Sequence, residues 1–270
     1  MEQLKDIEKY CLEQSIQTDF LRTLEVLMTS EKLIKSKERV QKHGEVFTPS
    51  WMVQKMLDTE GVKEACENLA ATFLEPAAGD GNFLVAILRR KLAMVSGQYN
   101  SSIRQYTHYS LYALSTLYGI ELLEDNAQMC VMNLFEVYKD FYEEAVEKHN
   151  YKQSEDTLNN AKSIISKNIV QGNFLTRKLS SGEPIVFSEW KIIKQTSTMI
   201  RVQRTEYSLD EIFSGNDKAM GTAFGLAVEA EQMDLFSDFD LELEPEREEL
   251  IQKYRDCNIT EVYDEVKVDE

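Results

Sequence analysis

The chain has 270 residues, and 43% of them are hydrophobic, which is enough to bury one sizeable core or two smaller ones. No stretch approaches the roughly 18 consecutive apolar residues of a membrane-spanning helix, and the first residues lack the pattern of a signal peptide, so we expect a cytoplasmic protein. Its four cysteines are far apart in the sequence, which argues against both a zinc site and a disulfide framework.

The net charge of −17 is concentrated near the C-terminus. From Glu229 onward there are 16 acidic and 4 basic residues, so this segment carries −12 and the remaining 228 residues carry only −5. We therefore predict an acidic, partly flexible tail over 229–270. Two basic stretches, at 31–42 and 177–204, are candidates for contact with DNA phosphates, although solvated surface charge is the simpler interpretation of each.

The predicted elements follow in chain order. Helical spacing of apolar residues predicts a helical N-terminal arm over 1–43, and Ser50 is placed to cap a further helix. Short apolar runs predict strands at 71–74, 117–122, 169–170 and 184–187, and helical patterns occur at 83–88, 103–114 and 124–148. Alternation of polar and apolar residues over 190–207 indicates antiparallel strands. Over 44–228 this order predicts an α/β domain with a doubly wound, mostly parallel sheet and helices on both faces.

A glycine-bearing turn is the first candidate site. The segment from Phe73 to Phe83 places two glycines and two alanines where a strand is followed by a helix, so a ligand can approach the backbone and the N–H groups of the first helical turn. No lysine of a phosphate-binding loop follows, and Leu84 replaces the third glycine of the dinucleotide fingerprint. At the end of the next predicted strand, Glu121 is placed to accept hydrogen bonds from both hydroxyls of a ribose. These features predict a ribose-containing cofactor whose binding does not depend on phosphates; a tight turn with packing glycines is the alternative.

Three motifs resemble those of the amino-group DNA methyltransferases, and the nearest match is the adenine-N6 class of restriction-modification systems. They are G-E-V-F-T-P at 44–49, E-P-A-A-G-D-G-N-F-L at 75–84 and Y-G-I-E-L at 118–122. The resemblance extends from residue 44 to about residue 175 and implies a Rossmann-like, S-adenosylmethionine-dependent methyltransferase fold. In that family the first motif closes over the cofactor, the second holds its methionine part, and the acid of the third holds the ribose.

The resemblance also assigns cofactor contacts residue by residue. Leu122 would pack on the adenine, and Asn173 stands where the family has an aspartate that accepts from the cofactor's amino group, so one charge-assisted hydrogen bond is weakened. The implied cofactor-binding residues are Phe47, Thr48, Pro49, Glu75, Pro76, Ala77, Gly79, Asp80, Gly81, Asn82, Glu121, Leu122, Asn173 and Phe174. No metal is implied.

The catalytic motif of the family is missing. Adenine-N6 methyltransferases use [NDS]-P-P-[YFW] to accept the amino hydrogens and to stack on a flipped base. This chain has four prolines and no two are adjacent. Ser188, Glu189 and Trp190 follow the fourth predicted strand, so we expect Ser188 and Glu189 to be acceptors and Trp190 to stack on a base. An ordinary strand end with a packed tryptophan is the other interpretation.

The tail suggests a partner. The sequence Gln232-Met233-Asp234-Leu235-Phe236 resembles the peptide with which bacterial polymerases and repair proteins dock on the DNA sliding clamp, and a short local apolar cluster is the alternative. The sequence therefore predicts an S-adenosylmethionine-dependent DNA (adenine-N6) methyltransferase, with DNA and a specificity or restriction subunit as partners and no membrane. The alternative is a catalytically inactive methyltransferase-like subunit or an anti-restriction protein that acts through its partners.

Overall fold

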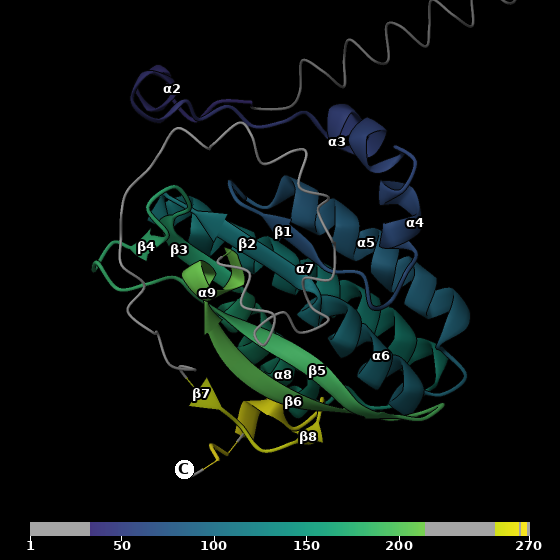
Figure 1. Ribbon diagram of the computed structural model, residues 1–270. Helices are drawn as coiled ribbons and strands as arrows, with labels where there is room; N and C mark the ends of the chain where they lie inside the picture. Colours follow the sequence, from purple (N-terminus) through teal and green to yellow (C-terminus); the bar gives the residue numbers. More distant parts are fainter. Residues whose placement is uncertain (1–32, 214–251, 265, 269–270) are drawn as a thin grey trace, which may run out of the picture. The chain divides into compact units, whose positions relative to one another are not determined.

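The computed structural model describes residues 33–213, 252–264 and 266–268 (Figure 1). It divides into two compact units, Met1–Gln54 and Lys55–Glu270. In the first unit, helix α2 (Lys37–His43) begins after Ser36, whose hydroxyl accepts from the backbone N–H of Arg39, and it ends at Gly44. This confirms the C-terminal part of the predicted helical arm, whereas residues 1–32 lie outside the described residues. Helix α3 (Ser50–Leu57) begins at the residue predicted to cap it.

The second unit contains a mostly parallel sheet of four strands in the order β1-β2-β3-β4. Its strands are β1 (Phe73–Glu75), β2 (Leu117–Glu121), β3 (Ile169–Asn173) and β4 (Lys178–Leu179). Strands β1, β2 and β3 are parallel, as predicted, and β4 pairs antiparallel with β3. The register pairs Glu75 with Gly119 and Glu121 with Gln171, so the carboxyl ends of the three parallel strands meet at one edge.

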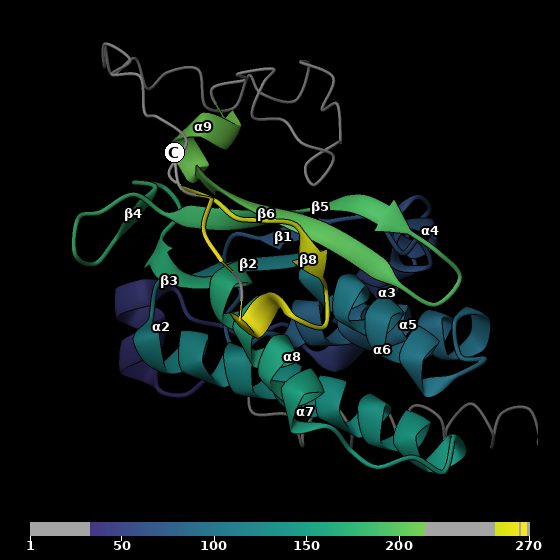
Figure 2. The same ribbon diagram turned by 90° about the horizontal axis from the view of Figure 1, so that it is seen from below.

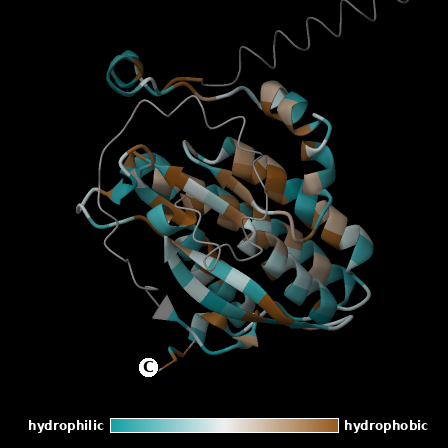
Figure 3. Cartoon of the chain, in the orientation of Figure 1, coloured by the Kyte–Doolittle hydropathy of each residue, from teal (hydrophilic) through white to brown (hydrophobic). Residues whose placement is uncertain are grey.

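Helices separate the parallel strands and pack on one another. Helices α5 (Asn82–Gln98) and α6 (Ile103–Ser115) lie between β1 and β2, and α7 (Glu124–Lys148) and α8 (Glu155–Asn168) lie between β2 and β3, whereas α4 (Val62–Cys66) precedes β1 and α9 (Leu209–Phe213) comes after the last of these strands. Helix α5 packs against α6 and α7, and α8 packs against α6 and α7 as well. Hydrophobic residues gather along α5 and the neighbouring strands, where Leu84 and Ile120 are fully buried (Figure 3). No helix in the described part of the chain is both long and apolar enough to span a membrane.

A second, antiparallel sheet replaces the predicted fourth parallel strand. Strands β5 (Val186–Gln195) and β6 (Ile200–Ser208) form a long hairpin, which confirms the antiparallel pattern but removes 184–187 from the parallel sheet. The physical reason is that only a short connection with β4 lies between β3 and β5, whereas a parallel return needs a long crossover. In Figure 2 the β5–β6 sheet lies on one side of β1 and β2, and α7 and α8 lie on the other.

The end of the chain joins this second sheet. Strands β7 (Gln252–Lys253) and β8 (Cys257–Asn258) pair with β6, and a short 3-10 helix, η3 (Val262–Asp264), follows. The side chains of Ile259 and Val262 are buried. The described end of the predicted acidic tail is thus part of the folded second unit.

Candidate cofactor site at the carboxyl edge of the parallel sheet

The turn between β1 and α5 is shaped by two glycines with positive φ. Gly79 has a φ of 56° and Gly81, which precedes α5, has a φ of 94°, values that favour glycine over residues with a side chain. A Cβ on Gly81 would lie 2.9 Å from the sulfur of Cys130 in α7. The N–H of Ala78 donates to the carbonyl of Ile120 at 2.9 Å, which fixes the turn to the neighbouring strand. Close packing and backbone conformation therefore both require the small residues noted in the sequence.

Glu121 holds this glycine turn. Its Oε2 accepts a hydrogen bond from the N–H of Gly79 at 2.7 Å, and its Oε1 accepts from the N–H of Leu123 at 2.9 Å. The amide of Asn126 lies at the hydrogen-bonding limit, 3.5 Å from the same Oε1. The Glu121 side chain is 7% exposed. Glu121, the residue predicted to bind a ribose, thus lies at the expected edge. Its carboxylate joins the end of β2 to the turn after β1 and to the start of α7.

Three carboxyl groups converge on this turn. Burial and, after it, the charges of Asp80, Glu121 and Glu75 raise the pKa of the Cys130 thiol to about 12. Burial also raises the pKa of Glu75, against a weaker opposing effect of a hydrogen bond from the N–H of Ala77. The acidic groups that gather at this edge favour a cationic ligand over a phosphate. No group of side chains in the described residues has the composition of a metal site.

The sequence did not single out several residues that support the turn. Asn133 donates from its side chain to the carbonyl of Asp80 at 2.8 Å. Gly119 lies where a Cβ would be 2.8 Å from the side chain of Leu84 and 3.3 Å from the Cβ of Ala78. The polar residues of α7 and the glycine inside the predicted strand are the signals from which these roles could have been inferred.

Other predicted cofactor residues of the second unit lie at the same edge. The flanking residues Pro76, Ala77 and Asn82 are exposed, as is Leu122 after β2, which a flat ligand could cover. By contrast, the side-chain oxygen of Asn173 accepts from the N–H of Leu175 at 2.9 Å and so caps its own turn. The ring of Phe174 packs edge-on against Phe213.

The remaining predicted cofactor residues belong to the first unit. Phe47 donates its N–H to the carbonyl of Leu33 at 2.8 Å, and the ammonium group of Lys35 lies over its ring. Thr48 and Pro49 follow in the connection to α3. Their role as a cover of the cofactor stays a prediction, because each unit is described by itself.

The predicted catalytic residues do not lie at this edge. Strand β5 runs opposite to β3, so Ile185 lies beside Gly172 near the carboxyl end of β3, whereas Trp190 hydrogen-bonds to Asn168 before the start of β3 at 2.9 Å. Trp190 is only 4% exposed. The structure therefore places Trp190 at the amino-terminal edge of the sheet, away from the glycine turn.

Ser188 and Glu189 are also buried. The hydroxyl of Ser188 accepts from the guanidinium of Arg204 at 2.9 Å, and its carbonyl accepts from the hydroxyl of Tyr118 at 2.8 Å. Burial raises the pKa of Glu189. The first bond joins β5 to β6 and the second joins the two sheets, and both match the interpretation of this segment as an ordinary strand with a packed tryptophan.

The three arginines among the six basic residues of the second basic stretch form ion pairs. Arg177 pairs with Asp210 at 2.8 Å, and Arg201 pairs with Asp256 at 2.6 Å. The buried Arg204 pairs with Glu206. These acidic partners reduce the charge that the stretch can offer to DNA phosphates. Of the first basic stretch, residues 31 and 32 lie outside the described residues.

Comparison of the chain with protein-family models, with curated proteins and with solved structures found no match.

Proposed function

We propose that the chain binds S-adenosylmethionine at the carboxyl edge of the parallel sheet and acts as a DNA methyltransferase-like protein of the adenine-N6 type. The observation that supports this proposal most strongly is the hydrogen bond between Gly79 and Glu121, which joins a glycine turn to an acid at the end of the next strand. The strand order β1-β2-β3 with intervening helices is compatible with part of a Rossmann-like fold.

The charge of the site supports this cofactor over ATP or NAD. Glu75, Asp80 and Glu121 all act on Cys130, so a phosphate bound there would meet several negative charges. S-adenosylmethionine carries a sulfonium and an ammonium group and no phosphate. The same carboxylates would attract its positive charges while Glu121 accepts from the ribose.

A second candidate function is that of a cofactor-binding but catalytically silent subunit. The burial of Trp190 at the other edge of the sheet favours it, because a base stacked on Trp190 would not meet a methyl donor at the glycine turn. In this alternative a partner chain carries the chemistry or the target recognition. If the chain does transfer methyl groups, then side chains other than Ser188, Glu189 and Trp190 accept the amino hydrogens.

The cofactor proposal is tested by isothermal titration calorimetry with S-adenosylmethionine, S-adenosylhomocysteine and ATP. We expect the first two to bind and ATP not to bind. Glu121→Ala should weaken binding of S-adenosylmethionine by about 1.5 to 3 kcal/mol, because a charged hydrogen bond is lost. Glu124→Ala is the matched control, since Glu124 lies one turn away and its carboxylate contacts Gln128 instead. If both variants weaken cofactor binding equally, or if the wild-type protein does not bind S-adenosylmethionine, the proposed site is wrong.

The two candidate functions differ in catalysis. Transfer of a labelled methyl group from S-adenosylmethionine to unmethylated genomic DNA would support the enzyme. Binding of the cofactor without transfer, in the presence of any copurifying partner, would support the silent subunit.

The clamp-binding prediction rests on sequence alone, because Gln232, Met233, Asp234, Leu235 and Phe236 lie outside the described residues. It is tested with the double variant Leu235→Ala/Phe236→Ala in a pull-down with purified sliding clamp. The substitutions leave the strands β7 and β8 in place, whereas truncation of the chain from residue 231 would remove them.

A further inference from the structure

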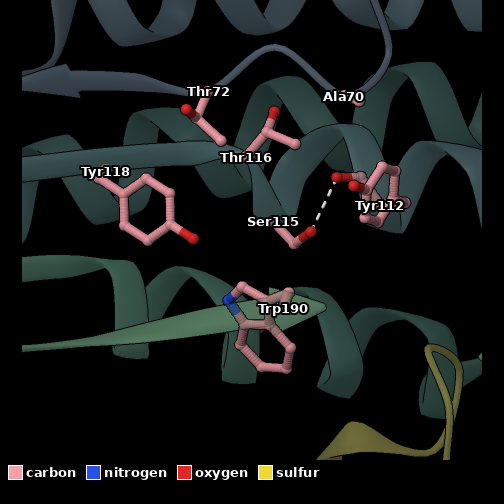
Figure 4. A pocket seen from close by; sticks show the side chains of 7 residues that line it. All are labelled: Ala70, Thr72, Tyr112, Ser115, Thr116, Tyr118 and Trp190. Carbon is pink, nitrogen blue, oxygen red and sulfur yellow. Dashed lines mark hydrogen bonds between the residues drawn. The ribbon is translucent and has the colours of Figure 1, made fainter. Parts of the chain in front are cut away.

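A small polar cavity lies at the amino-terminal edge of the parallel sheet, at the opposite end of the strands from the glycine turn (Figure 4). Its walls come from the segment before β1, the last turn of α6, the start of β2 and Trp190 of β5. Its volume of about 50 Å³ is room for roughly three water-sized groups.

Three hydroxyl groups in the wall have already donated their hydrogens. Ser115 and Thr116 each donate to a backbone carbonyl in the last turns of α6, at 2.8 and 2.7 Å. Tyr118 donates to the carbonyl of Ser188 at 2.8 Å. Each oxygen therefore offers only lone pairs, so a ligand that reaches these oxygens must itself be a hydrogen-bond donor.

The electrostatics of the cavity favour positive charge. Helix α6 has 13 residues, and its C-terminal end, which carries partial negative charge, forms one wall. The aromatic ring of Trp190 forms another wall and can face a cation. Figure 4 shows Trp190 across from Ser115 and Thr116.

A buried carboxyl group belongs to Glu189, which precedes Trp190 in β5 and lies outside the cavity lining. Glu189 is 5% exposed; Tyr207 hydrogen-bonds to its carboxyl group, and its Oε1 has no hydrogen-bond partner among the described residues. Burial raises the pKa of Tyr112 and of Tyr118, and the charge of Glu189 is the second cause of both shifts. The charge of Glu189 therefore acts on two residues of the wall. Glu189 can thus balance the charge of a cation.

The nearest cations of the chain use other acceptors. The ammonium group of Lys91 donates to the carbonyls of Asn68, Leu69 and Ala71. The guanidinium of Arg204 lies 6.0 Å from the centre of the Trp190 ring and donates to Ser188 and Glu206. The contacts of both groups therefore direct them to acceptors outside the hydroxyl wall.

We propose that this cavity binds a small monovalent cation with N–H donors, either an ammonium ion or the protonated amino end of a small ligand. The N–H groups donate to the hydroxyl oxygens of Ser115, Thr116 and Tyr118, and Glu189 balances the charge. The proposal does not depend on the proposed function, because the cavity and the glycine turn lie at opposite edges of the sheet.

Fluorescence of Trp190 provides a direct test. The chain has two tryptophans, so the variant Trp51→Phe leaves Trp190 as the only one. At constant ionic strength kept with sodium chloride, we expect a saturable change of its emission with ammonium and methylammonium chloride. Tetramethylammonium and potassium have no N–H group, so neither ion should compete with ammonium for the cavity. An equal response to either ion, or no saturable response to ammonium, would overturn the proposal.

Two variants in the Trp51→Phe background locate the site. Glu189→Gln removes the charge with little change of shape and should weaken methylammonium binding at least tenfold, whereas Glu183→Gln, at an exposed position, should have no effect. Thr116→Val removes one acceptor oxygen and should weaken binding severalfold, and it provides a second measurement if Glu189→Gln does not fold. Unchanged affinity in a folded variant of either kind would overturn the assignment.

Discussion

Glu121 accepts a hydrogen bond from the backbone N–H of Gly79 at 2.7 Å, although the two residues are 42 positions apart in the chain. The bond closes the glycine turn over the end of β2. A ribose that binds to Glu121 must therefore share this carboxylate with the turn. We expect amide hydrogen exchange at Gly79 to be faster in Glu121→Ala than in the wild-type protein, even without any cofactor. Equal exchange rates would show that Glu121 does not hold the turn.

Gly81 should not tolerate a side chain. Gly81→Ala places a Cβ 2.9 Å from the sulfur of Cys130 at a positive φ, so we expect a loss of about 2 kcal/mol in the free energy of unfolding, measured by chemical denaturation. Gly97→Ala, within the helix that Gly81 precedes, is the control: no atom lies within 4 Å of the new Cβ, and a gain of about 0.5 to 1 kcal/mol is expected. In Gly81→Ala/Cys130→Ala the steric part of the loss should be smaller. The idea fails if Gly81→Ala is as stable as Gly97→Ala.

Lys91 should make stability depend on pH. Burial lowers the pKa of its ammonium group to about 7, while the unfolded chain keeps the ordinary value near 10.5. Above pH 7 the unfolded state binds more protons than the folded state, so the contribution of Lys91 to stability should rise from about pH 7 to pH 10. Lys91→Met should lack this rise, and it should lose about 1 to 3 kcal/mol at pH 9, because the two N–H groups of the neutral amine no longer donate to the backbone carbonyls around them.

Denaturation curves at several pH values measure this effect. Arg89→Met, on the exposed side of the same helix, serves as control and should follow the wild-type pH profile. A profile of Lys91→Met that parallels the wild type would contradict the prediction.

His108 should make the stability of the protein depend on pH in the acidic range. Its Nδ1 accepts from the N–H of Ile200 at 3.1 Å, which requires the ring nitrogen to be unprotonated, and burial lowers the pKa. The contribution of this neutral ring is present above pH 6.5 and is lost as the pH falls below that value, because the unfolded state takes up a proton first. His108→Asn keeps an acceptor and does not titrate, so its stability should fall less steeply below pH 6.5. The exposed His43→Gln should behave as the wild type.

The variant Trp190→Phe tests whether Trp190 contributes to packing or to cofactor binding. The variant loses the hydrogen bond from Nε1 to the side chain of Asn168, and we expect a loss of about 1 to 2 kcal/mol in stability. Its affinity for S-adenosylmethionine should equal that of the wild-type protein, because the two places lie at opposite edges of the sheet. A weaker affinity with unchanged stability would contradict this arrangement and return Trp190 to the cofactor site.

Local patterns predicted most elements of the second unit. The helix expected over 124–148 is observed with those bounds, and the strand expected over 117–122 is observed as Leu117–Glu121. Both have long or uniformly apolar patterns that depend little on distant contacts. The glycine turn was equally readable, because its conformation requires glycine at Gly79 and Gly81.

Elements that depend on tertiary pairing were harder to predict. Helix α8 is not among the predicted elements, although Ser154 caps it and Ile164 and Ile165 are buried. Its polar first turns concealed the apolar face that follows. Residues 252 and 253 belong to the segment predicted as an acidic, partly flexible tail, yet they form β7, because the edge of β6 supplies partners that no local pattern contains.

The pairing of β7 and β8 with β6 has a topological consequence. The segment 214–251 is attached to the folded unit at both ends, at Phe213 in α9 and at Gln252 in β7. A clamp-binding peptide at 232–236 would therefore lie between two attachments to the same folded unit. A single proteolytic cut in this segment should also leave two fragments that co-migrate under native conditions and separate only in denaturant.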